Sequence, residues 1–315
     1  MDARYAYRGD ETAGAYVNRW LEACGCVRVD EVEQADAVFT HCFHTSAVED
    51  AYFDENGLIM HSRPGTLLID LSASTPSLAR EISAVASVND LRFVEAPLAA
   101  SDPFSPEAWV SPAAMVCYLS GEPDDCEAAA PFAGALAAEV HLTGNYGAAQ
   151  LAKAMKTVLQ ASQVMGALEA DALRHGLSEQ GYSEGPDPLL DVPFGRTFAE
   201  AQKLIASGEF ESAYTVALFM SDVAAAMATA DDGELILPHL EAALHILELG
   251  GVIGAADRGL AVLGLLYRDE AEGASVGLDW SRAESLYAEG YGDPPDGGFD
   301  DGYDFPDGFG AYSDN

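Results

Sequence analysis

The chain has 315 residues, which is enough for two domains that each bury a hydrophobic core. Its 52 acidic and 15 basic side chains give a net charge of −37, which argues against nucleic acid and anionic membranes as partners because no basic patch is visible. No apolar run approaches the roughly 20 residues of a membrane span, and the five cysteines follow no disulfide spacing, so we expect a cytoplasmic protein with reduced thiols.

The first elements have the order strand, turn and helix that is typical of a dinucleotide-binding unit. Residues 4 to 9 predict a strand and residues 10 to 24 predict a helix. Between them, Gly9 and Gly14 are the outer glycines of a GxGxxG turn, whereas Glu11 replaces the middle one. The middle glycine lets the backbone approach a pyrophosphate, and a carboxylate there adds bulk and like charge. The turn therefore supports the fold more strongly than it supports the ligand.

The next strand, at about 37 to 42, comes too soon for the usual strand, helix and strand of a full nucleotide-binding half. A segment is predicted to be missing, together with the acidic residue that would hold a ribose hydroxyl, unless Asp30 replaces it. Further strands alternate with helices as far as residue 143. This alternation predicts an α/β fold with a mostly parallel, doubly wound sheet.

A long helix opened by glycines follows, over about residues 144 to 175, and it holds two of the three lysines in the chain. One side carries an apolar stripe: Leu151, Met155, Val158, Leu159 and Met165. The opposite side carries a polar set: Lys153, Lys156, Thr157 and Gln160. The polar set is interpreted either as a solvated face or as a lysine aimed into a cleft, where it would be a proton donor or an anion clamp.

Four more helices are predicted, at roughly 194 to 207, 211 to 230, 236 to 250 and 255 to 268. From about residue 273 the chain becomes dense in Asp, Gly, Pro and aromatic residues. Such a composition cannot form a core, so residues 273 to 315 are predicted to be a disordered acidic tail that serves solubility or docks a partner through Tyr and Phe.

The order of these motifs resembles the β-hydroxyacid dehydrogenase family, which includes 3-hydroxyisobutyrate dehydrogenase and is related to 6-phosphogluconate dehydrogenase. The matching segments are AVEDAYFDENGLI, PGTLLIDLSASTPSLAREI, RFVEAPLAAS and the glycine-led helix, in family order over about residues 4 to 270. The resemblance implies a shortened Rossmann-like domain at 1–143, a helical domain at 144–272 and a homodimer.

The resemblance also implies a chemistry and the residues that carry it. Its cofactor would be NAD or NADP, next to Gly9, Gly14 and Ser72. Lys153 would be the general acid or base, Thr157 would stand where the family has an asparagine, and Ser101 would contact a small hydroxyacid or a related carbonyl or imine. Lys156, on the same polar side of the helix, is predicted to contact the substrate as well. No metal is expected: the CxC and HCxH groups, Cys24, Cys26, His41, Cys42 and His44, fit no common structural zinc site.

Several positions depart from the family pattern. A serine-threonine pair becomes Ser72-Ala73, a serine and double glycine become residues 99 to 101 (Ala-Ala-Ser), and a lysine-aspartate pair becomes Ser221-Asp222. Two interpretations stay open. The chain is an NAD(P)-dependent oxidoreductase with a remodelled substrate loop, or a non-catalytic family member that has lost dinucleotide binding and acts as a dimeric scaffold or ligand sensor.

Overall fold

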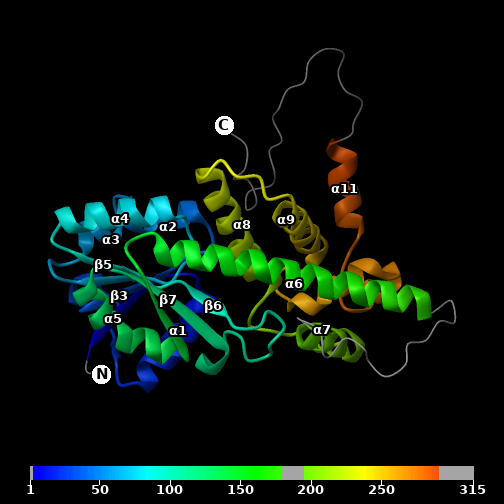
Figure 1. Cartoon of the computed structure of the whole chain (residues 1–315), viewed down its shortest axis with the longest axis horizontal. Helices are drawn as coiled ribbons and strands as arrows, with labels where there is room; N and C mark the ends of the chain where they lie inside the picture. Colours follow the sequence, from blue (N-terminus) through cyan, green and yellow to red (C-terminus); the bar gives the residue numbers. More distant parts are fainter. Residues whose placement is uncertain (1–2, 179–194, 291–315) are drawn as a thin grey trace, which may run out of the picture.

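The computed structural model describes residues 3–178 and 195–290, which form a sheet-based unit followed by a helical unit (Figure 1). Within these residues eight strands make one sheet in the order β2-β1-β3-β4-β5-β7-β6, with β8 paired to β7. Their bounds are β1 Arg4–Gly9, β2 Val27–Arg28, β3 Ala37–His41, β4 Leu67–Asp70, β5 Arg92–Glu95, β6 Leu98–Ala100, β7 Met115–Gly121 and β8 Glu139–Gly144.

The sheet is mixed. Strands β1 to β5 run parallel, whereas β7 is antiparallel to both β5 and β6 and parallel to β8. The register aligns Gly9 with His41 and Asp70 with Glu95, so the carboxyl ends of four neighbouring strands meet at one edge. The predicted α/β fold with a Rossmann-like, doubly wound sheet is confirmed.

The first unit is shortened in a different way from the prediction. The second strand is present as β2, but it has only two residues and pairs with the start of β1. A 3₁₀ turn at Val32–Gln34 stands between β2 and β3, where a full unit would have a helix. Because this connection is so short, Asp30 follows β2 closely and its side chain is exposed.

Helices cover both faces of the sheet: α1 Glu11–Ala23 and α5 Pro123–Leu136 on one face, and α2 Thr45–Phe53, α3 Leu58–His61 and α4 Pro76–Val88 on the other. Alternating strand residues divide between the two faces, as a two-residue period requires. Phe39 packs in the core under α1 and α5, and its neighbour Val38 packs under α2 and α4.

Helix α6, Ala148–Ser178, crosses from the sheet to the helical unit (Figure 1). Its first turn is fixed to the carboxyl ends of β4 and β5. Buried Glu95 accepts hydrogen bonds from the amides of Gly147 and Gln150, and the Gln150 side chain bridges Ser72 and Ser74. These contacts set which side of α6 faces inward.

The interpretation of the polar side of α6 as solvated is wrong. Lys153 is 2% exposed and Thr157 and Gln160 are buried, whereas Met155 and Leu159 are each 61% exposed. The apolar stripe therefore faces outward, except for buried Met165 and half-buried Val158. Helical periodicity identifies residues that share a side, but the partners fixed to the first turn decide which side is covered.

The helical unit contains α7 Gly195–Ser207, α8 Val216–Asp232, α9 Pro238–Gly250, α10 Glu270–Ser275 and α11 Ser281–Gly290. In place of the helix predicted at 255 to 268, the structure has a 3₁₀ run at Leu260–Tyr267. It is preceded by a π-helical turn at Gly251–Ala255, inside which Gly254 has a non-helical φ of 104°. The predicted tail also begins too early. Residues 273 to 290 include α11, whose Ala283 is buried against the core, and residues 291–315 lie outside the described part of the chain.

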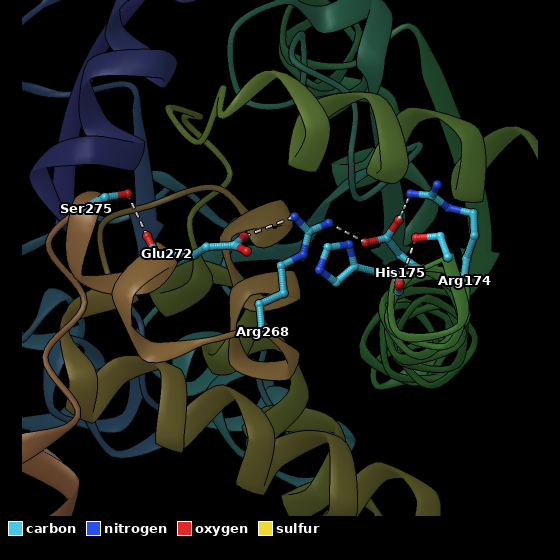
Figure 2. A network of polar contacts seen from close by, with 7 residues as sticks. Arg174, His175, Arg268, Glu272 and Ser275 are labelled. Atoms are coloured by element: carbon cyan, nitrogen blue, oxygen red, sulfur yellow. Dashed lines mark hydrogen bonds and ion pairs between the residues drawn. The ribbon is translucent and has the colours of Figure 1, made fainter. Parts of the chain in front are cut away.

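The far end of α6 is anchored by ion pairs (Figure 2). Asp171, 1% exposed, accepts from Arg174 at 2.8 Å and from Arg268 at 3.0 Å, and Arg268 also reaches Glu272. A buried carboxylate between two guanidinium groups holds α6 against the 3₁₀ run and α10. Among the described helices, none combines the length and hydropathy that crossing a membrane requires.

Candidate active site

Lys153 lies at the junction of the two units and pairs with an acid from the second one. Its Nζ is 2.6 Å from Oδ2 of Asp222 on α8, and the side chains are 3% and 12% exposed. The hydroxyl of Tyr214, which is fully buried, donates to the same oxygen at 2.8 Å. Burial and the Asp222 charge raise the pKa of Tyr214 well above its usual value. A buried lysine and carboxylate in such contact form an ion pair.

Two polar groups beside Lys153 lack hydrogen-bond partners among the described residues. They are Oγ1 of Thr157 and Oε1 of Gln160, although Nε2 of Gln160 donates to the Ala100 carbonyl at 2.9 Å. Buried polar atoms are nearly always satisfied in native proteins. These two atoms lie on the same side of α6 as Lys153, where a ligand could satisfy them.

Lys156 and Ser101 approach each other at the edge of this site. Nζ of Lys156 lies 3.5 Å from the Ser101 carbonyl oxygen, while the Ser101 hydroxyl donates to the Ala114 carbonyl at 2.9 Å. Burial, and then the positive charge of Lys153, lower the pKa of Lys156. The structure thus brings together Lys153, Lys156, Thr157 and Ser101, four of the residues predicted from the sequence.

His41 and Trp109 form the wall of the site on the sheet side. The two rings pack edge to face with their centroids 5.1 Å apart, and both side chains are buried. Desolvation and the nearby Lys153 charge lower the pKa of His41 to about 3, so its ring is neutral at pH 7. Nδ1 of His41 and Nε1 of Trp109 have no hydrogen-bond partner in the described part of the chain.

The glycine turn keeps its backbone shape. Gly9 has φ of 130°, and a Cβ there would overlap the His41 carbonyl oxygen, while a Cβ at Gly14 would lie 2.6 Å from the Tyr7 ring. These are the tight turn and the close helix packing that the outer glycines of a dinucleotide-binding turn provide.

The charge of the turn is the opposite of what a phosphate needs. The carboxylate of Asp10 accepts from the Ala13 amide at 2.8 Å and so caps α1, and Glu11 is exposed in the first helical turn. A helix N-terminus favours anions because its amides are unpaired. Here one of those amides is taken by a carboxylate, and a second carboxylate stands beside it.

Ser72, the third predicted cofactor contact, is engaged inside the sheet unit. Its hydroxyl accepts from the Cys42 amide at 3.0 Å, its amide donates to Asp70, and its carbonyl accepts from Gln150. Ser72 therefore joins the ends of β3 and β4 to the start of α6. Nearby Asp70 is fully buried, and desolvation raises its pKa to about 7.

The helical unit closes against the ends of the strands. The hydroxyl of Ser221 on α8 donates to the carbonyl of Phe43, just beyond β3. A hollow of about 290 Å³ remains beside α1, lined mainly by Thr12, Tyr16, Arg19, Trp109, Ala213 and Leu218. This hollow spans the two units and opens next to the glycine turn.

The cysteines and histidines considered as metal ligands are divided between two ends of the sheet. Cys24 and Cys26 precede β2 at its amino end, whereas His41 and Cys42 lie at the carboxyl end of β3. Among the described residues no three or more His, Cys, Asp or Glu side chains gather as a metal site.

Sequence reasoning missed Tyr214 and the role of Asp222, and it assigned no site role to His41 beyond metal ligation. The position of Asp222 in the family's lysine-aspartate pair was the one signal available for it. Nothing in the local sequence around Tyr214 or His41 indicates a place near the Lys153-Asp222 pair, because that pair forms only when α6 and α8 pack together.

A Rossmann-like sheet followed by a helical unit, with a lysine at their junction, is an architecture found in NAD(P)-binding oxidoreductases. Residues 8–144 match the NAD binding domain of 6-phosphogluconate dehydrogenase. The NAD-dependent L-serine dehydrogenase of Pseudomonas aeruginosa is 28% identical over 248 residues, which cover 76% of this chain and 80% of that protein. The 3-hydroxyisobutyrate dehydrogenase of the same organism is 25% identical over 266 residues, 81% of this chain and 80% of that protein.

A solved structure of Mycobacterium tuberculosis 3-hydroxyisobutyrate dehydrogenase with L-serine covers 85% of this chain and 100% of its own, with a TM-score of 0.66 and 20% identity. This likeness shows that the fold is shared. Residues 8–144 thus match an NAD-binding domain family, and over most of its length the chain is similar to β-hydroxyacid dehydrogenases such as 3-hydroxyisobutyrate dehydrogenase.

Proposed function

We propose that this chain is an NAD(P)-dependent oxidoreductase that acts on a small hydroxyacid or a related carbonyl or imine, with Lys153 as its acid-base group. The observation that carries the proposal is the buried Lys153-Asp222 pair, which joins α6 to α8 at the junction of the two units. A charged lysine in such a site can donate its proton to a substrate oxygen or nitrogen.

Each residue near Lys153 has a distinct part in this proposal. Asp222, oriented by Tyr214, keeps Lys153 protonated, so the lysine donates as a carbonyl is reduced and receives the proton in the reverse direction. The free Thr157 hydroxyl lies one helical turn from Lys153 and would hold the substrate beside it. Lys156 and Ser101 would contact a substrate carboxylate at the edge of the site.

The glycine turn fits the backbone path of a dinucleotide, which would lie along Gly9 and Gly14 with Ser72 close by. When bound, the nicotinamide supplies or accepts the hydride. The carboxylates of Asp10 and Glu11 would repel the pyrophosphate, so binding would be weak and would strengthen with salt.

A second candidate function has observations of its own. The Asp10 cap, Glu11 and the Ser221-Phe43 hydrogen bond each oppose a cofactor in the strand-end crevice. They favour a non-catalytic family member that keeps the Lys153 site as an anion-binding site and acts as a dimeric ligand sensor or scaffold. In both cases we propose a homodimer, because the helical unit exposes apolar helix faces.

Calorimetric titration with NADH and NADPH at low and high salt separates the two functions. The oxidoreductase predicts micromolar binding that tightens as salt rises, followed by substrate-dependent turnover that Lys153→Met abolishes. Lys203→Met is the matched control, because Lys203 is the remaining lysine of the chain and is 66% exposed on α7. A folded protein that binds neither nucleotide at any salt concentration would reject the oxidoreductase and leave the sensor.

A further inference from the structure

The outward side of α6 is an apolar strip that nothing in the described chain covers. Exposed residues recur every three or four positions along it from 151 to 177, a length of about 40 Å at 1.5 Å per residue. Leu151, Met155, Leu159 and Leu173 on this strip are 49%, 61%, 61% and 66% exposed. We call the strip the outer face of α6.

The outer face is symmetric about residue 164. Four pairs of exposed positions lie equally far from that residue, and three of them are similar in character: Leu151 and Leu177, Met155 and Leu173, Leu159 and Glu169, and Ser162 and Gly166. Only the third pair mixes an apolar residue with a charged one. In an antiparallel twofold pair each residue of one copy contacts the symmetric residue of the other, so these pairs would place apolar side chains on apolar ones and small residues on small ones.

Glycines on the outer face have no explanation within the chain. A Cβ added at Gly166 or Gly176 would meet no atom within 4 Å. Glycine inside an exposed helix costs about 1 kcal/mol relative to alanine, so a glycine that its own chain does not require calls for another reason. Small residues at the centre let two helices approach closely.

The low charge of the outer face also favours a second copy of the chain as its partner. The chain has a net charge of −37, yet Glu169 is the one acidic residue of the outer face, so a second copy could approach here with little direct repulsion. The ion pair of Asp171 with Arg268 joins the C-terminal half of α6 to the helical unit on the side opposite this face (Figure 2).

We propose that α6 packs against α6 of a second copy of this chain in an antiparallel pair, with the twofold axis near residue 164. The inference rests on the proposed homodimer and specifies its interface. In this register Leu159 of one copy faces Glu169 of the other, and Ser162 faces Gly166. The remaining pairs place leucine and methionine side chains against each other toward the two ends of the helix.

The Leu159-Glu169 contact gives a test that depends on this register. Leu159→Glu would oppose two carboxylates across the interface, whereas Leu159→Arg would create an ion pair with Glu169. Adding Glu169→Arg to Leu159→Glu would restore an attractive pair. An effect within one chain would have the opposite sign, because position 159 lies one helical turn from Lys156. There a glutamate would attract Lys156, whereas an arginine would repel it.

Sedimentation velocity of the full chain at fixed salt measures the dimer dissociation constant. We expect Leu159→Glu to raise it about tenfold or more, a change of about 1.4 kcal/mol, while Leu159→Arg and the double variant stay within about threefold of wild type. Ile236→Glu and Ile236→Arg are the controls for overall charge, because Ile236 is 84% exposed and lies outside α6. Far-UV circular dichroism verifies that each variant is folded.

The outcomes distinguish the interface from the homodimer itself. A wild-type dimer that Leu159→Glu weakens no more than Ile236→Glu does would overturn the α6 interface and leave the homodimer standing. A monomeric wild type at micromolar concentration would overturn both. Neither result depends on nucleotide binding, so the proposed chemistry is tested separately.

Discussion

Lys153 and Asp222 form a buried ion pair whose Nζ to Oδ2 distance is 2.6 Å, and Asp222 belongs to a different helix and a different unit of the fold. Asp222→Ala would leave the lysine charge buried without a partner, which destabilises proteins by about 3–5 kcal/mol. We expect the double variant Lys153→Met/Asp222→Leu to recover most of that loss, because no buried charge remains. Urea unfolding measures both, and equal stability of Asp222→Ala and wild type would refute the pair.

The exposed pair of Lys203 with Glu200 serves as the control for this experiment. Its side chains are 66% and 33% exposed, and surface pairs contribute about 0–1 kcal/mol. Glu200→Ala should therefore change the free energy of unfolding far less than Asp222→Ala does.

Glu11 gives a prediction for cofactor affinity. Removing its charge with Glu11→Gln should tighten NADH binding about fivefold at low salt, since two charges about 4 Å apart interact with about 1 kcal/mol in water. Glu11→Gly removes the side chain as well and should tighten binding further if the backbone must approach the pyrophosphate. Calorimetry at two salt concentrations measures the change. Identical affinities for all three proteins would place the obstacle elsewhere, with Ser221 as the next candidate.

His41 predicts a pH dependence of stability. Burial lowers the pKa of its ring to about 3 in the folded protein from 6.5, so below pH 6.5 the unfolded chain binds a proton that the folded chain excludes. Stability therefore falls as the pH falls, by up to about 1.4 kcal/mol per pH unit. Asp70, whose pKa is raised to about 7, contributes the opposite slope: its stability is present at low pH and is lost as the pH rises through 7.

The contribution of His41 is isolated by comparison with His41→Phe, which keeps an aromatic ring against Trp109. The stability difference between wild type and His41→Phe should shift against wild type from pH 7.5 to pH 5.5, as measured by urea unfolding at each pH. Working above pH 5 avoids the pI of about 4.1. A difference that does not vary with pH would mean that His41 takes up its proton while folded.

Asp171 and Glu272 share Arg268 as a partner but differ in burial, at 1% and 44% side-chain exposure. Asp171→Ala removes the partner of two guanidinium groups and should cost about 3 kcal/mol, within the range for a broken buried pair. Glu272→Ala should cost less than about 1 kcal/mol. Thermal unfolding compares the two, and equal losses would show that burial does not govern this network.

Local signals predicted most of the first unit. The turn between Gly9 and Gly14 and the apolar strands were visible in short stretches of sequence, because turn chemistry and two-residue alternation are local properties. The position of β7, antiparallel beside β5, was not visible, because strand pairing depends on distant partners.

The site was predicted only in part, for the same reason. Lys153 and Thr157 were identified from their helix and from the family resemblance, but the burial of their side follows from Glu95 and Gln150 fixing the start of α6. Tyr214 bonds the aspartate that pairs with the lysine, and His41 lies within reach of the lysine charge, and sequence periodicity does not reveal either relationship. The role of each predicted site residue stays a prediction.

One unbroken helix belongs to both units. The first turn of α6 is bonded to the ends of β4 and β5, and its last part is joined to the helical unit by the pair of Asp171 with Arg268. A rod of this kind leaves no pivot between the units, because bending it would break backbone hydrogen bonds inside the helix. We therefore expect a small molecule to reach Lys153 through movement of side chains or of the turns around Trp109. Access to this lysine is a question of local gating.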